Sequence, residues 1–157
     1  MRPGTENVPG IIGMGKAVEV AVADREKRSA RISSLRDKLI QGLLKIEDTR
    51  LNGHPEQRLP GNVNVSVKYV EGESMILSLD LKGIAASSGS ACTSGSLDPS
   101  HVLIAMGLDH QLAHGSLRMT LGTDNTEEEI DYVLAVMPEI VARLRSMSSV
   151  YASSKKE

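Results

Sequence analysis

A helical pattern of apolar residues from about Gly10 to Ile46 constrains the fold more than any other feature. Apolar side chains recur there mostly at spacings of three and four residues, as they do on one face of an α-helix. At about 1.5 Å per residue the helix would be roughly 55 Å long, which is more than one domain can cover. Residues 24–31 in its middle are nearly all charged. We therefore expect this middle stretch to be solvated or to bridge to another domain.

Two later segments alternate apolar and polar residues with the two-residue period of a β-strand that has one solvated face. The first is residues 62–69, in which Tyr69 follows three valines on the apolar face. The second is residues 116–121, which places Arg118 on the polar face. A further short strand is expected at residues 84–86.

Three more helices are expected. One covers residues 73–81, and a second starts at Asp98 with Pro99 in its first turn and ends at Gly107. The third begins with the capping box of Thr126 and Glu129 and continues in an apolar stripe.

Composition and the positions of proline and glycine predict one domain, residues 10–150, between two irregular ends. Residues 1–9 contain two prolines and are expected to be extended, and residues 151–157 are polar and expected to fray, as is the chain after Met147. Pro138 is expected to kink the last helix or divide it in two. With no Phe or Trp and three Tyr, the core must be built from aliphatic side chains.

Charge and motif content argue against several classes of function. The formal net charge of -2 gives no basic surplus for nucleic acid, and no apolar run approaches the roughly 20 residues of a membrane span. Residues 10–17 resemble a phosphate-binding loop, but Ala17 stands where a hydroxyl should bind magnesium. His110 and His114, expected in a loop, make a poor zinc site with one distant cysteine, and a role for His101 is not evident.

Cys92 is the only cysteine, and a lone cysteine is more often an inert apolar residue than a nucleophile. Its neighbours favour the second interpretation. Residues 87–96 are Ser, Gly, Ala and Thr around Cys92, with nothing bulky among them, so we expect a mobile loop that exposes the thiol. A thiol on such a loop suits a reaction that collects a group at one place and delivers it at another.

Several motifs together resemble one enzyme family. They are the cysteine loop continued by Leu97–Leu103, the segment Arg2–Asn7, the pair Asn64–Ser66 and Val70–Ser74, and the run Ser116–Gly122 with Thr126–Asp131. In these segments the chain resembles cysteine desulfurases of the NifS and IscS type, which are aminotransferase class V enzymes of fold-type I that use pyridoxal phosphate. The resemblance covers essentially the whole chain and corresponds to the carboxy-terminal small domain.

This resemblance implies a fold and roles for three residues. The fold would be an α/β (α+β) two-layer sandwich, in which the long first helix and the last helix cover a small, mostly antiparallel sheet. Cys92 would attack the sulfur of a cysteine substrate held as an imine on the cofactor, leaving alanine and an enzyme persulfide. Arg118 would clamp the substrate carboxylate. Thr5 would reach the cofactor phosphate of the neighbouring subunit.

The family's large cofactor-binding domain, with its Schiff-base lysine, has no counterpart in this sequence. No segment around Lys16, Lys38, Lys45, Lys68 or Lys82 matches the lysine motif. We therefore expect this chain alone to bind no pyridoxal phosphate stably, to be inactive alone, and to expose apolar surface where the large domain docks.

The resemblance further implies L-cysteine as substrate and a sulfur acceptor or iron-sulfur scaffold as partner. The full enzyme is expected to be a cytoplasmic homodimer. A different class of function is a free-standing persulfide carrier or protein-interaction module. The sequence does not identify the acceptor.

Overall fold

The computed structural model describes residues 4–88 and 99–154. The predictions for Cys92 and Asp98 therefore lie outside the described residues.

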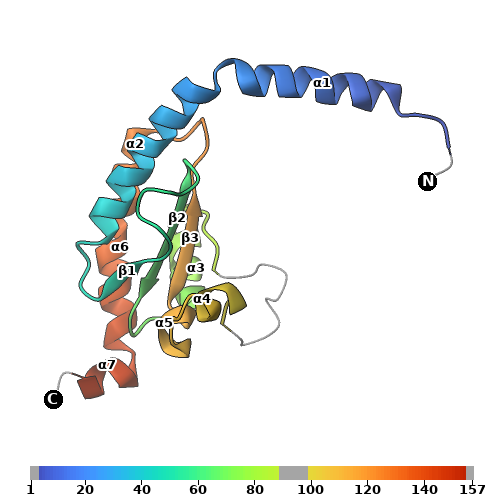
Figure 1. Cartoon of the computed structure of the whole chain (residues 1–157). Coiled ribbons are helices and arrows are strands. Elements are labelled where there is room, and N and C mark those ends of the chain that lie inside the picture. The colour runs from blue at the N-terminus through green and yellow to red at the C-terminus, as the bar shows by residue number, and fades with distance from the viewer. Residues whose placement is uncertain (1–3, 89–98, 155–157) are drawn as a thin grey trace.

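A three-stranded antiparallel sheet lies at the centre of the chain (Figure 1). Its strands are β1 (Thr49–Leu51), β2 (Asn62–Val67) and β3 (Ser116–Thr120), in the order β1-β2-β3. β2 is central, and its register places Val65 opposite both Leu51 and Leu117. The two segments with period two are thus neighbouring strands, as their alternation predicted.

Three helices cover the apolar face of this sheet. They are α2 (Arg25–Leu43), α3 (Gly72–Asp80) and α6 (Glu127–Ser146). Aliphatic side chains from all three pack on the strand valines, and Leu43, Met75, Met137 and Val65 have no exposed surface. The structure confirms the small antiparallel sheet with helices and the aliphatic core.

The long predicted helix is two helices, α1 (Val8–Ala23) and α2, separated at Asp24. The Arg28 guanidinium donates hydrogen bonds to the carbonyl oxygens of Val20 and Ala21, which are among the last four of α1 and lack helical partners. α2 packs on the sheet whereas α1 projects away from it (Figure 1). The prediction that one continuous helix covers the sheet was wrong.

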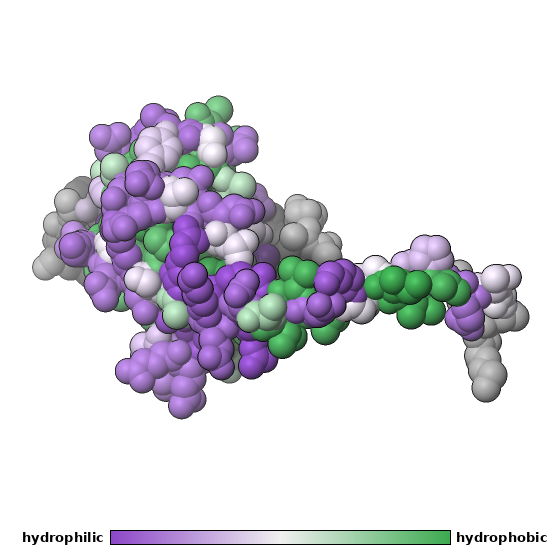
Figure 2. Space-filling model, turned by 90° about the horizontal axis from the view of Figure 1, so that it is seen from above, coloured by the Kyte–Doolittle hydropathy of each residue, from purple (hydrophilic) through white to green (hydrophobic). Residues whose placement is uncertain are grey.

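α1 starts two residues earlier than predicted, because Asn7 caps it and Pro9 is tolerated in its first turn. Every residue of α1 is exposed. Its large apolar side chains are 53–67% exposed, and Figure 2 shows apolar surface along the part of the chain that projects from the folded domain. They are Val8, Ile11, Ile12, Met14, Val18, Val20 and Val22. The expected exposed apolar surface is therefore present, and it lies on α1.

Across residues 4–88 and 99–154, the structure contains no helix with the length and apolar character that crossing a bilayer requires.

The strand predictions need three corrections. β2 ends at Val67, and Tyr69 adopts a positive φ of 67° in the turn that follows. Ser66 on the polar face is buried, because Asn52 covers it, so this face is not fully solvated. Residues 84–86 form no strand, and Ser87 makes an isolated bridge to Arg118 instead.

Helix starts and ends also differ in detail. α4 (His101–Ala105) begins two residues after Pro99, and Gly107 ends this region with a φ of 85°, as predicted. His110 and His114 lie in a short helix, α5 (His110–His114), and not in a loop, because the Asp109 side chain caps it.

The carboxy-terminal part is more regular than predicted. α6 continues through Pro138 as one helix. Residues 149–154 form another helix, α7 (Ser149–Ser154), in place of the predicted fraying. Its Tyr151 ring lies 5.5 Å from the Tyr69 ring and beside the Arg145 guanidinium, and these contacts hold α7 against the domain.

The capping box of α6 gives a first testable prediction. The Thr126 hydroxyl accepts a hydrogen bond from the Glu129 N–H, and the Glu129 carboxylate accepts one from the Thr126 N–H. We expect Thr126→Ala to lower the free energy of unfolding by about 1 kcal/mol, measured by urea denaturation. Thr123→Ala in the preceding loop is the control and should change it by less than about 0.5 kcal/mol.

The same box predicts a dependence of stability on pH. Hydrogen bonds from the Asn125 side chain and the Thr126 backbone lower the pKa of Glu129 below its ordinary value of 4.5. A lowered pKa stabilises the fold above the unfolded-state pKa, and this stabilisation is lost as the pH falls through the folded-state pKa. We expect Glu129→Gln to unfold at lower urea concentration than the parent chain at neutral pH. If the difference in urea midpoint between Glu129→Gln and the parent chain is as large at about pH 3 as at neutral pH, the lowered pKa of Glu129 does not stabilise the fold.

Candidate functional site

Arg118 lies in the middle of β3 on the polar face of the sheet, where its side chain is half-buried. Its backbone N–H donates to the Ser87 carbonyl at 2.6 Å, and its own carbonyl accepts from the Ser87 N–H at 3.0 Å. The guanidinium Nη2 lies 3.4 Å from the Ser87 hydroxyl oxygen. Arg118 is therefore fixed to the residue at which the predicted cysteine loop begins.

Amide side chains on the neighbouring strands lie next to Arg118 on the same face of the sheet. Asn64 of β2 is directly opposite Arg118, so the two side chains share a face. The Asn52 Nδ2 atom donates to Asn64 Oδ1 at 2.7 Å and to Ser66 Oγ at 2.9 Å. Asn52 could not be identified from the sequence, because it precedes a turn and no local pattern indicates which strand it will pair with.

Close packing also fixes the start of the loop. A Cβ atom on Gly72, the first residue of α3, would lie 2.6 Å from the Ser116 carbonyl oxygen and 3.2 Å from the Ser88 Cβ. Real Cβ contacts are never as short as the first of these distances, so the approach of α3 to β3 and Ser88 requires glycine. The residues before position 89 are thus held by both β3 and α3.

The structure does not bring Thr5 and Arg118 together. Thr5 is exposed just before α1, at the far end of the projecting helix. The described residues give its hydroxyl no hydrogen-bond partner, so it is available to an external acceptor such as a phosphate.

The described lysines do not fit the role of a Schiff-base residue, because all are exposed or half-buried. Lys16 pairs with Glu19 at 2.9 Å, and Lys38 pairs with Glu127 and Asp131. Hydrogen bonds to Asp131 and Glu127 raise the pKa of Lys38, which favours the charged ammonium over the neutral amine that imine formation needs. Of the groups that a cofactor site needs, the described residues therefore offer a phosphate contact at Thr5 and a substrate contact at Arg118, but no Schiff-base lysine.

The histidines and acidic residues offer no metal site within the described ranges. No group of three or more His, Cys, Asp or Glu side chains gathers there in a way that could hold an ion. His101, His110 and His114 are all exposed.

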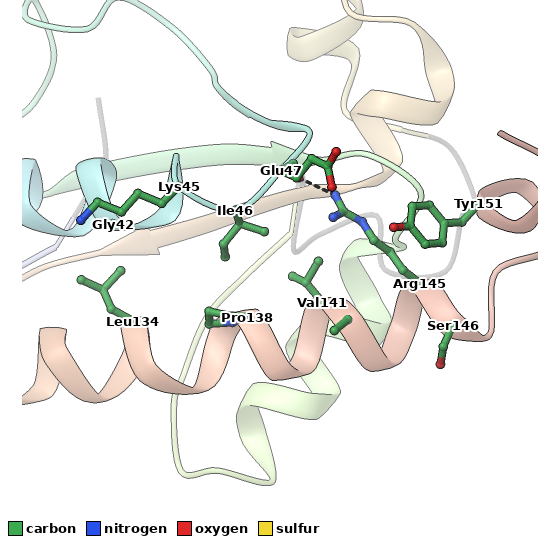
Figure 3. A pocket seen from close by; sticks show the side chains of 11 residues that line it. Gly42, Lys45, Ile46, Glu47, Leu134, Pro138, Val141, Arg145, Ser146 and Tyr151 are labelled. Atoms are coloured by element: carbon green, nitrogen blue, oxygen red, sulfur yellow. Dashed lines mark hydrogen bonds between the residues drawn. The ribbon is translucent and has the colours of Figure 1, made fainter. Parts of the chain in front are cut away.

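An open groove of about 720 Å³ lies between α2 and α6, with Tyr151 of α7 at one end (Figure 3). Arg145 lies in it and donates a hydrogen bond to the Glu47 carbonyl at 2.7 Å. Leu134, Pro138 and Val141 provide its apolar wall. Neither Arg118 nor Thr5 lines it, so this groove is separate from the polar face of the sheet.

The fold matches part of solved structures of NifS-like proteins. It matches a solved structure described as a NifS-like protein with a TM-score of 0.77 and 36% sequence identity. The match covers 91% of this chain and 36% of that one. A second solved structure, a NifS-like protein from Rickettsia africae, matches with a TM-score of 0.76 and 28% identity over 88% of this chain and 36% of its own.

Sequence comparison makes the assignment specific: residues 1–133 match the aminotransferase class-V family, and the chain belongs to that family. It is 60% identical over 94% of its length to the cysteine desulfurase IscS of Methanosarcina thermophila, covering 36% of that protein. It is also 55% identical over 96% of its length to cysteine desulfurase IscS 1 of Archaeoglobus fulgidus, covering 40% of it. The chain thus spans little more than a third of the length of these relatives.

Proposed function

We propose that this chain is the carboxy-terminal part of a pyridoxal-phosphate-dependent cysteine desulfurase and that it supplies the sulfur-accepting residue, Cys92. One observation carries the proposal most directly. The arginine expected to hold the substrate is paired by backbone hydrogen bonds with Ser87, five residues before Cys92. Substrate binding and sulfur acceptance would then share one structural anchor.

The reaction transfers one sulfur atom from L-cysteine to Cys92. The carbon–sulfur bond of the substrate breaks and a sulfur–sulfur bond forms, which gives a Cys92 persulfide. The proton that the Cys92 thiol gives up balances the one that the substrate carbon gains on becoming L-alanine. The thiolate is the attacking form of Cys92.

Arg118 would bind the carboxylate of L-cysteine. A guanidinium offers a planar pair of N–H donors that matches the two oxygens of a carboxylate. The β-sheet fixes the Arg118 backbone on both sides, since Asn64 lies opposite on β2 and Ser87 on the other edge. The backbone that carries the guanidinium is thereby held in place before substrate arrives.

Pyridoxal phosphate, when bound in the complete enzyme, supplies the electron sink without which the carbon–sulfur bond does not break. Thr5 would contact its phosphate group in the neighbouring subunit of a homodimer. The missing large domain would supply the lysine, and α1 would dock on that domain through its exposed apolar side chains.

The proposal also includes a sulfur acceptor and a cellular compartment. The Cys92 persulfide would pass its sulfur to an acceptor protein or an iron-sulfur scaffold, and the reducing cytoplasm is the expected compartment because it keeps a lone thiol reduced.

The activity is testable in two forms of the protein. We expect the chain alone to release no alanine from L-cysteine, and a polypeptide that joins it to the cofactor-bearing domain to do so. Cys92→Ser in the joined protein should lose persulfide formation by at least about 10³-fold, because a hydroxyl is a far weaker nucleophile. Alanine is measured by amino-acid analysis and the persulfide by mass spectrometry.

Cofactor absorbance provides the control, since Cys92→Ser should leave it unchanged. Turnover of L-cysteine by the isolated chain would refute the need for a second domain. Persulfide transfer from a separate desulfurase to the isolated chain, with no activity in the joined form, would instead support a free-standing carrier.

The apolar surface of α1 gives a prediction for the isolated chain. We expect concentration-dependent self-association by light scattering, because an apolar helix exposed on every side is unfavourable in water. Replacing Ile11 and Val18 with glutamate should shift the chain to monomer, whereas Lys16→Glu, at a position that is already charged, should not. A monomeric parent chain at all concentrations would contradict the role given to α1.

A further inference from the structure

Four polar residues form a row across the polar face of the sheet at one level: Asn52, Asn64, Arg118 and Ser87. The Asn52 N–H donates to the Asn64 carbonyl at 2.9 Å, which extends the β1–β2 register by one residue. Asn64 is opposite Arg118, and Arg118 is opposite Ser87. We call these residues the polar row.

The hydrogen-bond pattern makes Asn64 and Arg118 a close pair. Val67 donates to Gly115 and Leu121 donates to Gly61 across the same two strands, so the hydrogen-bonded pairs of this ladder are at 67/115 and 61/121 and at every second position between them. Asn64 and Arg118 therefore form a non-hydrogen-bonded pair, in which Cα atoms lie about 4.5 Å apart and side chains come closest.

The chemistry of the pair points to an acceptor. Asn52 Nδ2 occupies Asn64 Oδ1, which fixes the orientation of the Asn64 amide and leaves its Nδ2 as a donor. The Arg118 guanidinium also has only donors. Two donor groups cannot hydrogen-bond to each other, but side by side they can bind one carboxylate.

We propose that Asn64 Nδ2 is a second donor to the substrate carboxylate beside Arg118, and that Asn52 is a positioning residue that sets the Asn64 amide. This inference rests on the proposed function and deepens it, because it assigns the carboxylate site to the strand pair and not to Arg118 alone.

A purely structural role explains the row less well. Asn52 is only 4% exposed, and its Oδ1 has no hydrogen-bond partner among the described residues. A buried acceptor without a partner destabilises a fold, so an apolar residue at 52 would serve stability better. What Asn52 provides is a pair of donors that orient Asn64 Oδ1 and Ser66 Oγ.

The test measures steady-state kinetics of the complete enzyme with L-cysteine. We expect Asn64→Ala to raise KM about tenfold, as loss of one hydrogen bond to a charged group does, with kcat changed less than about twofold. Asn64→Asp keeps the size of the side chain, places a negative charge beside the carboxylate, and should raise KM more. Asn52→Ala should raise KM about threefold by releasing the Asn64 amide.

Asn62→Ala is the matched control, because Asn62 lies on the same strand and face opposite Thr120. It should leave KM unchanged. Inhibition by cysteamine, which is L-cysteine without the carboxylate, should be equal in the parent and in Asn64→Ala. A structural disturbance would weaken cysteamine and L-cysteine alike, and that result would overturn the inference.

Arg118→Lys separates this inference from the proposed function. If Arg118→Lys leaves KM for L-cysteine unchanged, the proposed carboxylate site itself is wrong. If Arg118→Lys raises KM while both Asn64 variants behave like the parent, Arg118 acts alone and only the role of Asn64 fails.

Discussion

The register between β2 and β3 is the constraint on which the rest of the structure depends. It places Val63, Val65 and Val67 against the helices and, by the alternation of a strand, turns Asn64 and Ser66 to the opposite face. A slip of one residue would bury Asn64 in an aliphatic core and expose the valines. The pressure to bury aliphatic side chains therefore also fixes the pairing of Asn64 with Arg118.

The sequence predicted those parts of the fold that depend on local periodicity and capping. The two strands, α3 and the capping box of α6 follow from spacings within each segment. The break at Asp24 could not be predicted from periodicity, because it depends on Arg28 bonding back to the last carbonyls of α1. The burial of Ser66 was missed for a similar reason, since it depends on Asn52, fourteen residues away.

The candidate site also has features that local sequence predicts and features that depend on distant residues. Alternation placed Arg118 on the polar face, but its bond to Ser87 joins residues 31 apart, and no local pattern predicts such a pairing. Thr5 was assigned by resemblance alone, whereas Cys92 was assigned from its small, mostly polar neighbours together with the resemblance. The roles proposed for both residues involve groups outside this chain, so the forces that fold the chain do not identify them.

The bridge between Ser87 and Arg118 has a consequence for how such domains diversify. The bridge fixes the chain at Ser87, next to Arg118, and α4 begins at His101, so both sides of the sequence that contains Cys92 are anchored in the fold. The entropy of closing a segment grows slowly, by about 0.6 kcal/mol for each doubling of its length. Under the proposed function, a change in the length of the sequence between these points would alter the reach of Cys92 at a small cost in entropy, while the strands that hold Arg118 stay the same.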